Sequence, residues 1–131
     1  MPSFLAPLTI RGVGEAAIVV VDQGGSVLAW SAEAERLTGH RGEDMVGKSV
    51  ETFVPAQLRE RHRRGFGRAM ETGVAKAEGG AAAIPVLCAD GAVRRFAGRF
   101  TILRDAYGTA SGAAAVFREI EPDGEPLWEL Q

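Results

Sequence analysis

The sequence predicts an α+β fold in which helices cover one side of an antiparallel sheet. Two short strand-like runs come first in the chain, and three longer ones come last. The segment between them has helical spacing and helix-ending glycines. Strands grouped on either side of a helical segment are typical of α+β domains rather than of alternating α/β domains.

The first two strands form a predicted hairpin. Residues 16–21 are a run rich in β-branched side chains, and residues 26–30 are the returning strand. Asp22-Gln-Gly-Gly between them is a typical turn sequence. Three helical segments are then predicted from the glycines at their ends, with Ser31 at the start of the first and Pro55 before the third. They are residues 31–37, 43–46 and 56–71, which end before Gly39, Gly47 and Gly73.

Three antiparallel strands complete the predicted sheet. They are residues 81–87, 93–103 and 112–120. The first two are joined at Asp90-Gly91, which is a strong hairpin signal.

Composition restricts the class of protein. The chain has 131 residues, enough for one core, and its formal net charge of -2 gives no general attraction to nucleic acid or anionic membranes. The longest apolar stretch, residues 16–21, is too short to span a bilayer. The single cysteine, Cys88, excludes an internal disulfide and fits a reducing compartment. We therefore expect a soluble, cytoplasmic protein.

Several segments together resemble a PAS domain. They are Ile18-Val-Val-Val-Asp22, Trp30-Ser31, Leu37-Thr-Gly39, Met45-Val-Gly-Lys48 and the Asp90-Gly91 hairpin. The resemblance implies a five-stranded antiparallel sheet with flanking helices that enclose a ligand pocket. It divides the chain into an N-terminal segment (1–14), a PAS domain (15–120) and a C-terminal tail (121–131). It does not by itself assign a function, because PAS domains bind different ligands or none.

The long predicted helix places a histidine on its apolar face. Leu58, His62, Phe66, Ala69 and Met70 fall at helical spacing, whereas the arginines of this segment lie mostly off that stripe. An inward imidazole needs a partner for its nitrogens. A hydrogen-bonded neighbour, a metal or a cofactor would each satisfy it.

The pattern Pro55-x-x-x-Arg59-x-x-His62 resembles the helix that carries the proximal haem histidine in haem-binding PAS domains of bacterial oxygen sensors. The spacing from His62 to Asp90 needs no gap in that alignment. The resemblance implies haem b with His62 as the iron ligand and Arg68 and Lys76 near the propionates. Phe66, Ile84 and Val86 would contact the haem.

The residues that would lie on the other side of the haem from His62 differ from those of the oxygen sensors. Ala82 stands where they have an oxygen-stabilising arginine, and Gly80 where one has a coordinating methionine. With Gly98, these small residues predict either a roomy distal pocket bounded by Phe96 and Phe100 or close packing of the chain. A roomy pocket would leave the iron five-coordinate.

Three functions remain open at this point. The first is a haem-based sensor of a small gaseous or organic ligand, acting as a homodimer or through a signalling partner in trans. The second is a haem-dependent enzyme, for which N-nitroglycine lyase is a precedent at the level of domain and cofactor; Arg94 or Arg99 would then steer an anionic substrate. The third is a dimerisation module without haem, with residues 4–8 as an apolar contact segment.

Overall fold

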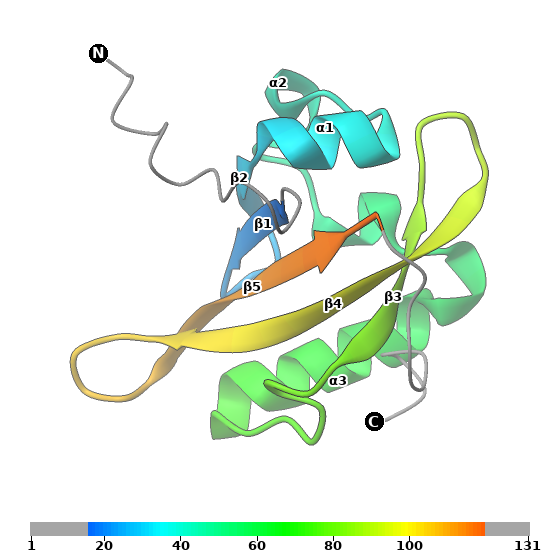
Figure 1. Cartoon of the computed structure of the whole chain (residues 1–131). Helices are drawn as coiled ribbons and strands as arrows, with labels where there is room; N and C mark the ends of the chain where they lie inside the picture. The colour runs from blue at the N-terminus through cyan, green and yellow to red at the C-terminus, as the bar shows by residue number, and fades with distance from the viewer. Residues whose placement is uncertain (1–15, 120–131) are drawn as a thin grey trace, which may run out of the picture.

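The computed structural model describes residues 16–119 and confirms the α+β fold with a five-stranded antiparallel sheet (Figure 1). The strands are β1 (Ala17–Asp22), β2 (Val27–Trp30), β3 (Ala82–Leu87), β4 (Val93–Arg104) and β5 (Ala110–Arg118). The helices are α1 (Ala32–Thr38), α2 (Gly42–Met45), α3 (Arg59–Thr72) and the 3-10 turns η2 (Val50–Phe53) and η3 (Ala56–Leu58).

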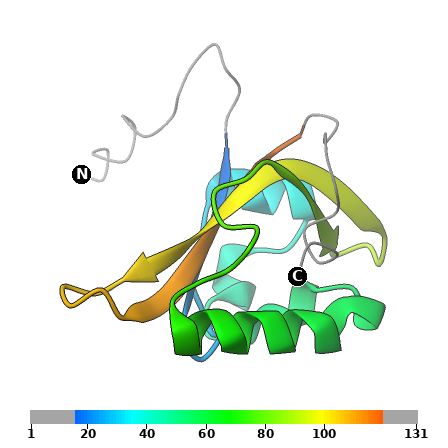
Figure 2. The same cartoon turned by 90° about the horizontal axis from the view of Figure 1, so that it is seen from below.

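The sheet order is β2-β1-β5-β4-β3, so the first and last strands, β1 and β5, pair with each other inside the sheet. The register pairs Val19 of β1 with Ala115 of β5, and Gly98 of β4 with Phe117 of β5. The sheet curves, and α3 lies along its concave side (Figure 2). The apolar core is therefore formed between the sheet and the helical segment.

Local sequence signals account for the turns and caps. Asp22 Oδ1 accepts hydrogen bonds from the backbone N–H groups of Gly24 (3.0 Å) and Ser26 (2.9 Å), which fixes the first hairpin. Ser31 caps α1 by accepting a hydrogen bond from Ala34 N at 3.2 Å. Gly39 ends α1 with a left-handed φ of 80°, a conformation that costs glycine little.

The structure corrects several predicted boundaries. The long helix was predicted as one element from residue 56, but its first turn is the separate 3-10 turn η3. The turn η2 was not predicted, because four residues carry too little periodicity to reveal it. Strand β5 begins at Ala110, two residues earlier than predicted. The predicted domain boundaries, the tail 121–131 and the segment 4–8 lie outside the described residues.

Candidate functional site

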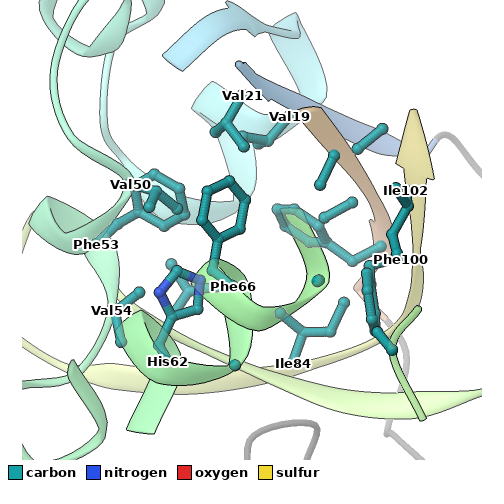
Figure 3. A pocket seen from close by; sticks show the side chains of 18 of the residues that line it. Val19, Val21, Val50, Phe53, Val54, His62, Phe66, Ile84, Phe100 and Ile102 are labelled. Carbon is teal, nitrogen blue, oxygen red and sulfur yellow. The ribbon is translucent and has the colours of Figure 1, made fainter. Parts of the chain in front are cut away.

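The apolar stripe of α3 faces the sheet, as the helical spacing predicted. His62 is 4% exposed and Ala69 is also buried, while Leu58, Phe66 and Met70 are half-buried. The helix ends at Gly73, whose left-handed φ of 74° lets its N–H bond to Ala69 O. Helix capping and amphipathicity thus turn the imidazole of His62 inward (Figure 3).

A cavity lies between α3, η2 and the concave face of the sheet. Within it, about 90 Å³ is open to the centre of a water-sized sphere, several times the ~10–15 Å³ that one buried water requires. Its walls are aliphatic and aromatic side chains almost throughout. Of the described residues that line it, His62 alone carries an ionisable side chain.

Burial determines the protonation state of His62. Desolvation lowers the pKa of the imidazole to about 4; the nearby charge of Glu51 opposes this shift and that of Arg63 adds to it. The ring is therefore neutral at pH 7. It stacks on Phe66, with ring centroids 5.8 Å apart and planes 15° from parallel. A neutral imidazole in an apolar cavity can donate one hydrogen bond and accept another, or bind a metal.

The structure brings together only part of the predicted haem-contacting set. Phe66, Ile84 and Val86 line the cavity with His62. Arg68 on α3 and Lys76 in the following loop are exposed and do not line it. Arg68 and Lys76 can pair with the carboxylates of a ligand only where that ligand extends to the protein surface.

The predicted distal residues divide in the same way. Phe100 lines the cavity, whereas Phe96 is buried against Phe117 at a centroid distance of 5.2 Å. Ala82 is buried outside the lining, and Gly80 is exposed.

Gly98 provides no extra room. A Cβ atom there would lie 2.5 Å from Val116 O and 2.7 Å from both Ile84 Cδ1 and Phe117 Cβ. Of the two interpretations of these small residues, the structure favours close packing at Gly98.

Several lining residues were missed by the sequence reasoning. Ala69 and Met70 belong to the predicted stripe of α3 but were not assigned to the site. Ile102 follows Phe100 at the two-residue spacing of a strand, so alternation along β4 could have identified it. Val50 and Phe53 come from η2, whose position no local signal revealed.

Four other polar residues lie outside the lining of the cavity. His40 is half-buried, and its Nε2 donates to Leu87 O at 2.8 Å. Arg94 forms an ion pair with Asp90 at 2.7 Å. Arg99 is exposed and donates to Gly79 O at 2.9 Å. Neither arginine lines the cavity, so neither is placed to steer a substrate within it. Cys88 is 3% exposed.

One side chain of the cavity, His62, has the donor atom that a haem iron requires. His62 supplies the neutral nitrogen that iron requires, and the surrounding walls are apolar. The space beside it is smaller than a porphyrin, so a haem would require the walls of the cavity to move apart. Residues 16–119 contain no group of three or more His, Cys, Asp or Glu side chains that could hold a metal ion by themselves. No helix in that range is long and apolar enough to cross a membrane.

Comparisons with known proteins agree with the fold. The chain is 31% identical over 105 residues to an uncharacterized protein of Azorhizobium caulinodans. The match covers 79% of this chain but only 14% of that protein. A PAS domain from Colwellia psychrerythraea has a TM-score of 0.67 at 23% identity, over 80% of this chain and 86% of that one.

Another structural neighbour was solved in complex with a ligand. It is the PAS domain of the quorum-sensing receptor RpfR of Cronobacter turicensis in complex with C12:0, with a TM-score of 0.60 at 15% identity. The similarity covers 85% of this chain and all of that one (100%). The sequence profile described as the PAS fold matches residues 14–122. The chain therefore belongs to the PAS family, whose domains are typically sensor and signalling modules.

Proposed function

We propose that this PAS domain is a sensor that binds haem b in the cavity under α3, with His62 as the axial ligand of the iron. The observation that carries the proposal is the position of His62. It is 4% exposed, it is neutral at pH 7, and it is the ionisable group of an otherwise apolar wall. These are the properties of an imidazole that ligates haem iron.

The opposite wall supports a five-coordinate iron. The sheet contributes Ile84, Phe100 and Ile102 there, none of which has a donor atom for a metal. Met70 has a thioether but lies on the same helix as His62, eight residues and about 12 Å further along the axis. Bound haem would supply a site for a small gaseous or organic ligand, while the apolar walls exclude bulk water from it.

The signal has to leave the domain through its surface. We propose a second copy of the chain or a separate signalling partner as the receiver, in the cytoplasm. The cytoplasmic assignment is supported by Cys88, which is a free, buried thiol and so suits a reducing compartment.

An absorption spectrum tests the proposal directly. The purified chain, reconstituted with haem, should show the Soret band of a histidine-ligated haem, and the ferrous form without added ligand should be five-coordinate. His62→Ala should abolish this spectrum. His40→Ala is the matched control, because His40 is the other histidine of the chain and bonds to Leu87 O instead.

Rescue by free imidazole separates ligation from a structural role. In His62→Gly, added imidazole should enter the space left by the side chain and restore the histidine-type spectrum. The absence of a Soret band in the wild type would contradict haem binding. An unchanged spectrum in His62→Ala would contradict ligation of the iron by His62.

A second candidate is a sensor of an apolar small molecule without iron. The lining of the cavity favours it, and the RpfR domain of the same fold was solved with C12:0. His62 would then form a hydrogen bond with a polar end of the ligand. Because the imidazole is neutral, an uncharged twelve-carbon alcohol should raise the melting temperature more than dodecanoate does. A larger effect of dodecanoate would contradict this role of His62.

A further inference from the structure

One end of the cavity is closed by a loop rather than by a helix or strand. Residues 73–80 leave the C-terminal end of α3 and cross to the start of β3 (Figure 2). Within this loop, Ala75 lines the cavity, and it packs beside Met70 and Ile102. The position of the loop therefore decides whether this end of the cavity is open or closed.

The carboxylate of Glu78 joins the loop to β4. Glu78 Oε2 accepts hydrogen bonds from the backbone N–H of Ile102 at 2.7 Å and from Thr101 Oγ1 at 3.1 Å. Glu78 Oε1 pairs with Arg104 Nη2 at 3.1 Å. The side chain of Glu78 is 22% exposed and that of Arg104 is 39% exposed, so the pair is partly shielded from water. These contacts hold the Glu78 pKa below its ordinary value.

The two ends of the loop are fastened to the same strand. Arg104 Nη2 also donates to Gly73 O at 2.7 Å, where the loop begins. At the other end, Gly79 N donates to Phe100 O at 3.0 Å, and Arg99 Nη1 donates to Gly79 O at 2.9 Å. Glu78 and Arg104 thus form the centre of a set of polar contacts between the loop and β4.

Opening the cavity here costs less than opening it elsewhere. The opposite end is closed by Val50 and Val54, which are buried in the main apolar core. Separating that end would expose core side chains to water. Lifting the loop breaks polar contacts that water can replace, and the apolar side chains that it would expose, Ala75 and Ala77, are smaller than Val50 and Val54. Gly73 and Gly79 have positive φ values of 74° and 79°, so the backbone is least restricted at the two places where the loop would turn.

We propose that residues 73–80 are the gate through which ligands enter and leave the cavity, and that Glu78, with Arg104, is the latch that holds it closed. The gate rests on the proposed function only in requiring that the cavity binds a ligand. It does not depend on whether that ligand is haem.

Stopped-flow fluorescence of the full chain without haem tests the latch. The probe is N-phenyl-1-naphthylamine, a neutral apolar fluorophore. Glu78→Ala should speed both uptake and release by about tenfold, because charge-assisted hydrogen bonds that close the gate are lost. Arg104→Gln should act in the same direction, and the double variant should add little to Glu78→Ala. The dissociation constant should change less than either rate.

The matched controls break a similar ion pair at the other end of β4. Asp90→Ala and Arg94→Gln remove the pair at the β3–β4 hairpin, which is remote from the gate, and should leave both rates unchanged. Hydrogen exchange gives a second measurement. The backbone N–H groups of Gly79 and Ile102 should exchange faster in Arg104→Gln, while those of β1 should not.

Each outcome decides the proposal. Unchanged rates in folded Glu78→Ala and Arg104→Gln would overturn it, as would equal acceleration in the hairpin controls. If the wild type takes up no probe, uptake by Glu78→Ala alone supports a closed latch, and uptake by no variant overturns the gate. A missing Soret band together with faster probe exchange would reject haem and keep the gate.

Discussion

The two walls of the cavity differ in how much change they can accept. The sheet wall has no spare room, since a Cβ atom at Gly98 would lie 2.5 Å from Val116 O and one at Gly112 would lie 2.2 Å from Val21 O. On the helical wall, a Cβ atom at Gly67 of α3 would meet nothing within 4 Å, and the loop after α3 is held by polar contacts. None of these three glycines lines the cavity, so the contrast concerns how tightly the two layers around it are packed.

The largest expected effect is on the sheet wall. Gly98→Ala should lower the free energy of unfolding by about 3 kcal/mol, because the new methyl group meets backbone and packed side chains that have no space to retreat. Chemical denaturation of the variant and the wild type measures the difference. A loss below 1 kcal/mol, within the scatter expected of ordinary substitutions, would show that this wall can also adjust.

The next effect concerns the imidazole on the helical wall. The pKa of His62 is about 4 in the folded protein, against 6.5 for an ordinary histidine. Between these values the unfolded chain binds more protons, so stability should fall as the pH falls. From pH 6.5 to 5 the loss from this group is about 2 kcal/mol. Urea denaturation of the chain without haem across this range should show a shallower pH dependence in His62→Gln. An identical pH dependence would mean that the imidazole of His62 is exposed to water in the wild type.

The smallest effect tests the tolerance of α3. Gly67→Ala should raise the free energy of unfolding by about 0.5–1 kcal/mol, since alanine is the better helix former and its methyl group points into open space. Thermal melting of this variant beside Gly98→Ala compares the two walls under the same chemical change. Destabilisation by Gly67→Ala would contradict the difference between them.

Much of the fold could be predicted because its signals are local. The Asp22–Gly25 and Asp90-Gly91 turns, the Ser31 cap and the stripe of α3 each depend on residues within a few positions of one another. The inward direction of His62 followed from the same stripe. The boundaries of η3 and β5 did not, because short turns and strand ends depend on packing partners elsewhere in the chain.

The shape of the site was less predictable. Alternation along β4 correctly puts Phe100 on the inner face, but it does not tell whether space remains beside Gly98. That depends on Ile84 from β3 and Phe117 from β5, which the sheet register brings to the same point. The haem assignment stays a prediction for the absorption spectrum.

By itself, the sequence determined the order of the elements and the face of α3 on which His62 lies, since hydrogen-bonded turns, caps and helical periodicity act over a few residues. Only the tertiary structure decided that Gly98 is packed shut and that Glu78 meets Arg104 across 26 positions of sequence. The first arises when the sheet register brings β3 and β5 to either side of β4, and the second when the loop after α3 folds against β4. No local pattern records the distance between side chains that far apart in the chain.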